Sequence, residues 1–381
     1  MNDLELAVLA VTIAFALGAL LLVATVILKL LHRHRMQAHE ARRARYLVML
    51  STHLASPGSI PELSLKEAED DAFIDAVIDV RNTVIGPSVD ALDGIIDKSG
   101  LIKLQEARLR ARWPLAKRLR AVVSLAEIGD SRASRLLMHH LSDPEPEIRV
   151  QCARGLARMR HTPAIDSILN RFSTESPWVR SRFAEALALF GRDAVWPLTA
   201  FIRVNHRYRD TKGVPEAVRV LERIGDSEVG PALSELLYTV EDIEVRLAII
   251  EALGEVGGPL SLRPLRRTFL SDDWRVRAKT ARAFAEIGDP SVMPILATGL
   301  ADPSWWTRRN SAAALAALPG GIDLLYQAMR SPDRFARDAA AEALADCGEL
   351  IAARDRLEKG EATERDHDLI GHMEEPGLVP A

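Results

Sequence analysis

The chain has 381 residues, of which 48% are hydrophobic and only 5% are aromatic, and 49 Lys and Arg face 53 Asp and Glu. Residues 1–49 hold six of the basic residues and three of the acidic ones, so the remainder is more negative than the formal net charge of −4 indicates. This balance disfavours a dedicated nucleic-acid-binding protein. Cys152 and Cys347 lie far apart in helical patterns and fit buried small residues in a reducing compartment, with no disulfide or zinc spacing.

Residues 1–31 are predicted to form a transmembrane anchor. Residues 6–28 carry no charge, and a helix of this length spans about 34 Å, enough for a hydrocarbon core of about 30 Å. Two acids precede the run, and Lys29, Arg33 and Arg35 follow it. Because basic residues mark the cytoplasmic side, we expect the N-terminus outside and the rest of the chain in the cytoplasm. A cleaved signal peptide is the alternative, but it would begin with basic residues and have a shorter apolar core.

Residues 32–64 are predicted to form a basic juxtamembrane helix and a linker, and residues 65–112 a degenerate helical cap. The arginines after the apolar run either only set the topology or also contact anionic lipid headgroups, and both interpretations stay open.

A repeat of about 31 residues dominates residues 113–356. Seven of its eight anchor positions are Arg, a leucine or phenylalanine follows each anchor by seven residues, and a glycine usually follows by eleven. The anchors are Arg118, Arg149, Arg180, Val214, Arg246, Arg277, Arg308 and Arg337. Each unit reads as two antiparallel helices with capping residues at their ends. The pattern predicts an all-α fold, an α-solenoid of about eight helix pairs, because each unit buries its apolar face only against its neighbours.

The segments 177–187 and 277–289 are similar to the consensus of HEAT-like repeats, the short bacterial kind first associated with phycobilisome bilin lyases. The resemblance implies a structural role for the anchor arginines, which in that family usually hydrogen-bond acids in or beside their repeat. Acids lie four to six residues ahead of several anchors, namely Asp143, Glu175, Glu241, Asp272 and Asp302. Val214 departs from this pattern.

After residue 356 the chain turns polar and acidic, and residues 357–381 are predicted to form a disordered tail. The largest insertion between repeats is the basic segment 203–213, which either binds a phosphate or acidic partner or is ordinary solvated sequence. The chain shows no nucleophile elbow, phosphate loop or paired-histidine motif, and His139 and His140 fit an ordinary surface pair. No catalytic residue, metal ligand, cofactor or small-molecule substrate is therefore predicted.

Charged residues two, five and nine positions after the anchors share one helix face, usually the concave face of such solenoids. Early units place basic residues there, namely Arg120, Arg154, Arg158, Arg182, Arg219 and Arg223. Later units place acids there, namely Glu251, Glu255, Glu286, Glu342 and Asp346. The exceptions are Glu127, Glu185, Lys279 and Arg282. One hypothesis is a groove that binds a partner of opposite polarity, and the other is ordinary solvated charge.

Aromatic residues precede several anchors by two or three positions, namely Trp178, Trp274, Trp305, Trp306 and Phe335. Packing between repeats is the first interpretation of these residues. Because a tandem pair cannot face one way, either Trp305 or Trp306 is expected to be exposed as a binding residue.

These features favour a membrane-anchored, non-catalytic scaffold or adaptor that binds a protein partner at the cytoplasmic face of the bacterial inner membrane. An anchor raises the effective concentration of a partner nearby. Similar anchored HEAT-repeat proteins look like companions of membrane enzymes such as envelope glycosyltransferases. The resemblance also leaves open a bilin-lyase-like, chromophore-handling enzyme, and a nucleic-acid-binding HEAT protein is a further alternative.

Overall fold

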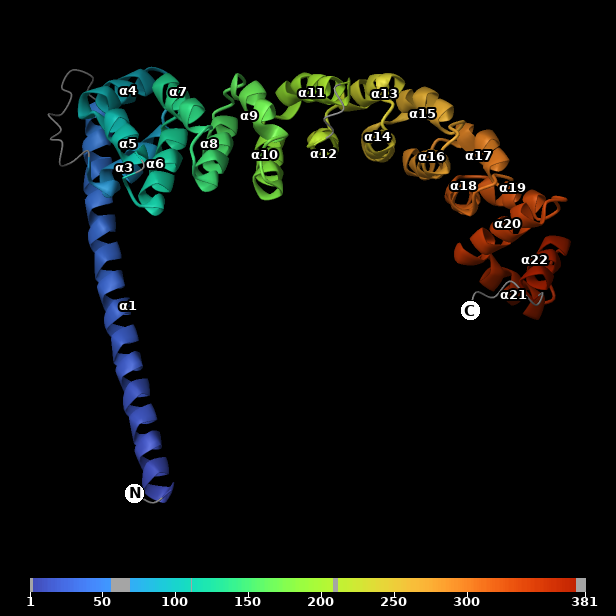
Figure 1. Cartoon of the computed structure of the whole chain (residues 1–381), viewed down its shortest axis with the longest axis horizontal. Helices are drawn as coiled ribbons and strands as arrows, with labels where there is room; N and C mark the ends of the chain where they lie inside the picture. Colours follow the sequence, from blue (N-terminus) through green and yellow to red (C-terminus); the bar gives the residue numbers. More distant parts are fainter. Residues whose placement is uncertain (1–2, 56–68, 111, 208–211, 375–381) are drawn as a thin grey trace. The chain divides into compact units, whose positions relative to one another are not determined.

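The computed structural model describes residues 3–55, 69–110, 112–207 and 212–374, and the regular elements within them are all helices (Figure 1). The chain divides into two compact units, Met1–Met159 and Arg160–Ala381. The all-α prediction is confirmed.

The first unit begins with one long helix, followed by shorter helices that pack as pairs. These are α1 (Asp3–Ala55), α3 (Asp71–Arg81), α4 (Pro87–Ser99), α5 (Leu101–Leu109), α6 (Leu115–Ile128), α7 (Ser131–His140) and α8 (Pro146–Arg158). Helices α1 and α6 both pack against α3, and α6 packs against α8. The predicted juxtamembrane helix is therefore continuous with the apolar segment before it, and it extends to Ala55.

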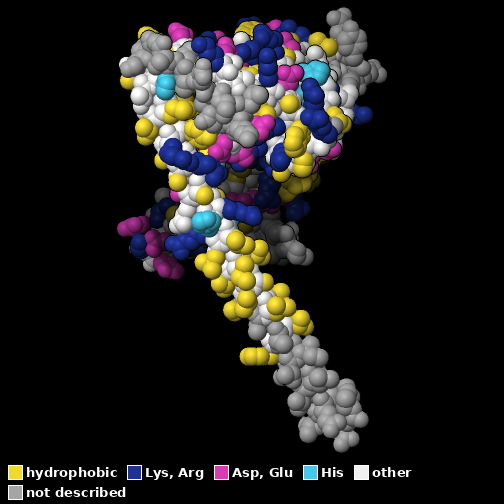
Figure 2. Space-filling view, turned by 90° about the vertical axis from the view of Figure 1, so that its left-hand side faces the viewer, with side chains coloured by type: hydrophobic (Ala, Val, Ile, Leu, Met, Phe, Trp, Pro, Cys, Tyr) yellow, Lys and Arg dark blue, Asp and Glu magenta, His cyan; other side chains and the backbone are white. Residues whose placement is uncertain are grey.

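Hydrophobic side chains are exposed along the described part of the apolar segment of α1, from Phe15 to Leu31 (Figure 2). They occupy consecutive positions such as 20–23 and 26–28, so they face all sides of the helix. Among the residues that the structure describes, no helix has both the length and the apolar character needed to cross a membrane. Residues 1–2 and the side chains at 3–14, 16 and 19 lie outside this description, and the anchor over 1–31 stays a prediction.

The last turns of α1 are part of the core of the first unit. Leu50 is fully buried, and the ring of Tyr46 meets the edge of Phe73 on α3 at a centroid distance of 5.4 Å. Burial of a leucine and an aromatic pair contributes about 2–3 kcal/mol or more. This end of α1 is therefore fixed to the cap formed by α3, α4 and α5.

The second unit consists of two rows of helices (Figure 1). The first helices of the repeats are α9 (Ala164–Phe172), α11 (Val195–Arg207), α13 (Val229–Thr239), α15 (Leu262–Thr268), α17 (Met293–Gly299) and α19 (Gly321–Ala328). The second helices are α10 (Pro177–Leu189), α12 (Val214–Ile224), α14 (Ile243–Val256), α16 (Trp274–Ile287), α18 (Trp305–Ala317) and α20 (Arg334–Asp346). Each second helix packs against the next one in the row, and short 3₁₀ turns at Gly191–Ala194, Pro259–Ser261 and Pro290–Val292 lead into α11, α15 and α17.

Helix α16 shows why the repeat sequence folds in this way. The Asp273 side chain accepts a hydrogen bond from the Arg275 amide and caps the first turn. Gly288, with φ of 73°, ends the helix in the left-handed conformation that glycine adopts without strain. Between them Val276, Ala281 and Phe284 are buried, at the spacing of one helix face.

Small residues allow the second helices to approach closely. A Cβ atom added to Gly155 on α8 would lie 2.8 Å from the Cβ atom of Ala126 on α6. A Cβ atom added to Gly254 on α14 would lie 3.1 Å from the Cα atom of Ala283 on α16. The rows are thus packed to the limit of backbone contact at these positions.

Val214 interrupts the arginine series because α12 lacks one turn. The anchor arginines are each the fourth residue of their helix, whereas α12 begins at Val214 itself. Gly213 before it has φ of 81°, and Pro215 occupies the first turn. The anchor position of this repeat therefore lies at the start of its helix and not one turn inside it. The insertion at 203–213 begins inside α11, and its residues 208–211 lie outside the described part of the chain.

The chain remains folded after residue 357, where the sequence predicted a disordered tail. Helix α21 (Glu349–Glu358) is followed by α22 (Glu364–Glu374), which packs against it. Leu369 is fully buried, and the carboxylate of buried Asp366 accepts hydrogen bonds from Arg356 and Thr363. These contacts compensate the polar composition that suggested disorder. Residues 375–381 of the predicted tail lie outside the described residues.

Candidate functional site

The anchor arginines clamp the loop between the two helices of their own repeat. Nη1 of Arg277 donates to the carbonyl oxygens of Ser271 and Asp272, at 2.8 and 3.0 Å. Arg149, Arg308 and Arg337 bond the carbonyls six and five residues before them in the same way. The predicted structural role is visible in this geometry, although the acceptors within the repeat are backbone carbonyls.

The acidic partners come from the following repeat. Arg118 pairs with Asp143 at 2.5 Å with both side chains buried, and Arg277 pairs with Asp302 at 2.7 Å. Nε of Arg180 lies 4.0 Å from a carboxylate oxygen of Glu216 on α12. The remaining anchor arginine of this unit, Arg246, is half-buried. Asp143 and Asp302 also accept backbone N–H bonds at the start of α8 and α18. One carboxylate thus caps a helix and links two repeats.

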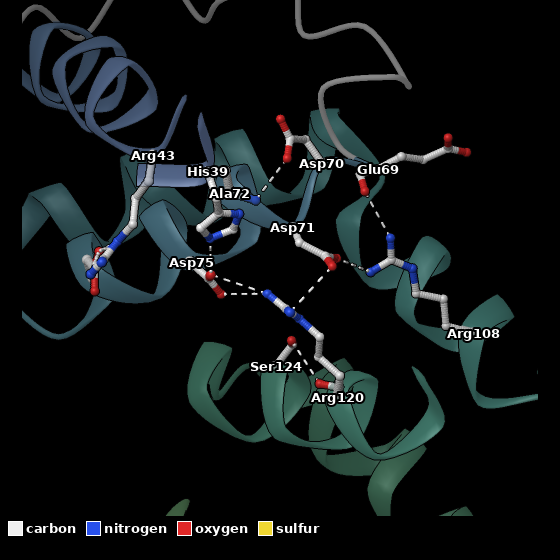
Figure 3. A network of polar contacts seen from close by, with 11 residues as sticks. His39, Arg43, Glu69, Asp70, Asp71, Ala72, Asp75, Arg108, Arg120 and Ser124 are labelled. Carbon is white, nitrogen blue, oxygen red and sulfur yellow. Dashed lines mark hydrogen bonds and ion pairs between the residues drawn. The ribbon is translucent and has the colours of Figure 1, made fainter. Parts of the chain in front are cut away.

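A network of acids and bases fixes α1 to the cap (Figure 3). Asp75 on α3 contacts His39 of α1 at 2.9 Å and Arg120 of α6 at 3.2 Å, and Arg120 also lies 3.4 Å from Asp71. Arg43 of α1 pairs with Asp79 at 2.6 Å. Arg120, a predicted partner-binding residue, is therefore engaged within its own unit.

The spacing of charged residues on α1 and α3 could have predicted this network from the sequence. Acids at 71, 75 and 79 recur every four residues on α3, and His39 and Arg43 are also four apart on α1. Such spacing places each set on one helix face. Arg42 also pairs with Asp70, at 2.9 Å. His39, Arg42 and Arg43 thus bind protein carboxylates, which leaves Lys29, Arg33 and Arg35 as exposed bases nearer the apolar segment.

The exceptions to the predicted charge stripe neutralise part of it. Arg158 pairs with Glu127 at 2.5 Å, and Arg182 pairs with Glu185 at 2.9 Å. Further along, Glu251 pairs with Lys279 at 2.7 Å, Glu286 with Arg282 at 2.9 Å, and Arg219 lies 3.7 Å from Glu216. Arg154, Arg223 and Glu255 are exposed and have no ion-pair partner among the described residues. Local ion pairs therefore neutralise part of the stripe, and these three charges stay exposed.

Carboxylates nevertheless gather where α12, α14 and α16 adjoin. Burial and then the charges of Glu255 and Glu251 raise the pKa of Glu222 on α12, although Arg219 and Arg223 oppose them. Like charges raise a carboxyl pKa because a second negative charge is disfavoured. Glu251 and Glu255 on α14 thus disfavour ionisation of Glu222.

The aromatic residues before the anchors stand at the starts of the second helices, and they are exposed. Trp274 is 43% exposed and Trp306 52%, and Trp178, Trp305 and Phe335 are exposed to a similar degree. Each of these side chains is thus partly covered by its neighbours and partly open to solvent. Trp305 and Trp306 meet edge to face at 4.6 Å, and both remain accessible.

Trp274 and Trp306 line one groove of about 520 Å³ between α14, α16 and α18. Ala248 and Ala278 also line the groove, as do the pairs Glu244–Arg275 and Glu251–Lys279 and the side chain of Arg282. The Asn310 side chain bonds the Ala278 carbonyl at 2.9 Å across the two helices. Seven of the eleven lining residues lie one, two or five positions after an anchor, and Glu251 is the one candidate residue of the predicted charge stripe among them.

A second hollow of about 320 Å³ lies between α18 and α20. It is lined by small residues such as Ala313 and Ala339, and Glu342 and Asp346 are at its edge. Cys347 is exposed here, whereas the sequence predicted a buried small residue. Cys347 follows the end of α20 as its C-cap, so it leaves the buried face. Cys152 is buried as predicted.

The histidine pair has structural contacts. His140 bonds the buried Asp143 at 3.0 Å, and the ring of His139 meets that of His140 edge to face. Across the described part of the chain, no group of three or more His, Cys, Asp or Glu residues is placed to hold a metal ion. In the inserted segment, Arg203 on α11 pairs with Glu235 on α13 at 2.8 Å.

Comparison with known proteins supports the repeat assignment. A family model described as HEAT repeats matches residues 105–188, 135–210, 215–274 and 269–345. No curated protein matches the chain. The structure of human deoxyhypusine hydroxylase in complex with glycerol is 19% identical over 65% of this chain and 96% of its own, with a TM-score of 0.28. The structure of Kap121p is 12% identical over 82% of this chain and 39% of its own, with a TM-score of 0.48. The chain thus spans less than half the length of Kap121p.

Proposed function

Because the chain belongs to the HEAT-repeat family, whose model matches more than half of it, we propose that it is a non-catalytic scaffold or adaptor for a protein partner. The partner binds along the second helices of the unit Arg160–Ala381. The groove between α14, α16 and α18, lined by the exposed rings of Trp274 and Trp306, is the observation that carries this proposal.

Exposed tryptophans at a hollow are the residues that dominate binding energy at protein interfaces. Each indole is partly exposed, and Ala248 and Ala278 add apolar surface to the same groove. Removing about 100 Å² of such surface from water contributes about 2.5 kcal/mol. Ion pairs line the same groove and would form the polar rim of a stable interface.

We further propose that α1 anchors this scaffold in the bacterial inner membrane with its repeats in the cytoplasm. The uncharged residues 6–28, the exposed apolar side chains from Phe15 to Leu31 and the bases that follow them support this proposal. An anchored scaffold meets partners at the membrane surface at a raised effective concentration. A membrane enzyme of the cell envelope, such as a glycosyltransferase, is the kind of partner proposed.

Site-specific photo-crosslinking in native membranes tests the scaffold. A photoreactive residue replaces Ala248 in the groove of the full-length chain, and captured proteins are identified by mass spectrometry. We expect one specific protein, lost with Trp306→Leu and retained with Trp196→Leu, which removes an exposed tryptophan from α11. Capture that is equal in both variants would contradict the groove. Release of the chain by alkaline carbonate would contradict the anchor alone.

A further inference from the structure

Two of the exposed aromatic rings in the row of second helices are covered by arginines of this chain. The guanidinium carbon of Arg308 lies 4.8 Å from the ring centre of Phe335, and that of Arg309 lies 5.2 Å from the ring centre of Trp305. Trp274 is the first residue of α16 and Trp306 the second of α18, and no cation of the described residues is stacked on either ring. The groove leaves these two indoles open to a cation from outside.

The carboxylates of the groove are more accessible than the bases that they bind. The Glu244 side chain is 73% exposed against 42% for Arg275, and Glu251 is 52% exposed against 26% for Lys279. A carboxylate has acceptor sites for more than one donor, so each of these acids can bind a second base without losing the first. In each of these two pairs the carboxylate is the more accessible group, and Arg282, the third base that lines the groove, is paired with Glu286.

Acids next to Glu251 also disfavour further negative charge. Glu255 has no ion-pair partner among the described residues, and together with Glu251 it disfavours ionisation of Glu222 on α12. Of these three acids Glu251 lines the groove, so a cation bound to Glu251 relieves part of that repulsion.

We propose that the groove between α14, α16 and α18 binds an arginine side chain on an extended segment of the partner. Its guanidinium plane stacks on Trp274 or Trp306, and its N–H groups donate to Glu244 and Glu251. This assignment rests on the proposed scaffold function and specifies the chemistry of the partner.

Arginine fits better than lysine because its planar guanidinium stacks on an indole, is weakly hydrated and presents several donors in fixed directions. An extended segment suits the groove because adjacent helix axes lie about 8–10 Å apart, which about three residues of extended chain cover. A segment that crosses from α16 to α18 can thus place one side chain near each indole.

Indole N–H signals provide the test, since the chain has only 6 Trp. The full-length protein, labelled with ¹⁵N-tryptophan and held in nanodiscs, is titrated with a glycine–serine peptide that carries two central arginines. A peptide with citrulline in their place has the same shape and no charge. We expect the arginine peptide to shift the Trp274 and Trp306 signals, and the citrulline peptide to leave them in place.

Substitutions assign the effect to the groove. Trp306→Leu, and Glu244→Gln combined with Glu251→Gln, should each weaken peptide binding about tenfold, the size of one desolvated cation–aromatic or charge-assisted contact. Trp178→Leu removes a similarly exposed ring at the start of α10, outside this groove, and should leave binding unchanged. Unchanged positions of the remaining indole signals show that each variant is folded.

Equal shifts with both peptides, or shifts spread over the other indoles, would overturn the arginine assignment. If crosslinking in membranes still captures a specific protein through the groove, the scaffold function stands and only the partner chemistry is wrong. If crosslinking captures nothing but the arginine peptide still selects the two indoles, the partner assignment fails and the ligand chemistry holds.

Discussion

Arg277 and Asp302 come from successive repeats and form a two-pronged ion pair, with Nε–Oδ2 and Nη2–Oδ1 distances of 2.7 and 2.8 Å. The two side chains are only 15% and 9% exposed. The same arginine bonds the loop carbonyls of its own repeat, and the same aspartate caps α18 through the Ser304 amide. Two side chains thus fix three segments of the row.

Arg277→Leu should lower the free energy of unfolding by about 3 kcal/mol, because it leaves the largely buried Asp302 without its cation. Chemical denaturation of the purified chain measures the loss. Arg282→Leu on the same helix removes an exposed pair with Glu286 and should cost less than about 1 kcal/mol. Equal losses from both variants would show that burial of the Arg277 pair is unimportant.

The Arg277–Asp302 pair should make the free energy of unfolding depend on pH in the acid range. Burial tends to raise the pKa of Asp302, but hydrogen bonds from Arg277 and the Ser304 amide outweigh it and hold the pKa below its ordinary 3.8. A carboxyl with a lowered folded-state pKa stabilises the fold above its unfolded pKa, and this stability is lost as pH falls through the folded value. Stability should therefore fall below about pH 4, and Asp302→Asn should be less stable than the parent at neutral pH and less sensitive to acid. An unchanged acid dependence in Asp302→Asn would contradict this.

Asp366→Asn should loosen α22. Hydrogen bonds from Arg356 hold the pKa of Asp366 below its ordinary 3.8, and Thr363 donates to the same carboxylate through its amide and hydroxyl, both at 2.8 Å. Losing the charge should cost about 2 kcal/mol locally, or roughly thirtyfold faster amide exchange in α22. Asp368→Asn, which removes an exposed pair with Arg330, is the matched control and should change little.

Gly155→Ala and Gly371→Ala should have effects of opposite sign. Both glycines are in helices, where alanine is intrinsically better by about 1 kcal/mol. A Cβ atom at Gly155 meets that of Ala126 at 2.8 Å, so overpacking should exceed this gain and give a net loss of about 1 kcal/mol. Gly371 has open space around it, and alanine there should stabilise α22. A stabilising Gly155→Ala would show that α6 and α8 can move apart freely.

Periodicity was enough to predict the repeats, because a buried face every 31 residues appears directly in the sequence. The anchor arginines and the face that lines the groove follow from the same period. Spacing within a repeat did not reveal that Asp302 serves the preceding arginine, since that depends on how one repeat sits on the next. Nor did it show that Lys279 and Arg282 neutralise the acids beside them.

The errors have a common physical origin in local composition. Residues 364–374 are polar and acidic, yet Leu369 and Ile370 are buried once Arg356 has compensated Asp366. Exposure within the Trp305–Trp306 pair was expected, whereas the groove beside Trp306 depends on small residues of other helices such as Ala248 and Ala278. The composition of one segment does not predict which side chains of other segments will pair with it or pack against it.

Helix α1 is unbroken from Asp3 to Ala55, so the angular phase of its two ends is locked. One residue inserted between Arg35 and His39 would turn His39, Arg42 and Arg43 by about 100° relative to the apolar segment. The cap, which is held by those side chains, would have to rotate with them or detach. An insertion of seven residues, close to two full turns, restores the phase within about 20° and shifts the cap along the axis by about 10 Å. The helix therefore sets both the direction in which the cap faces and its distance from the apolar segment.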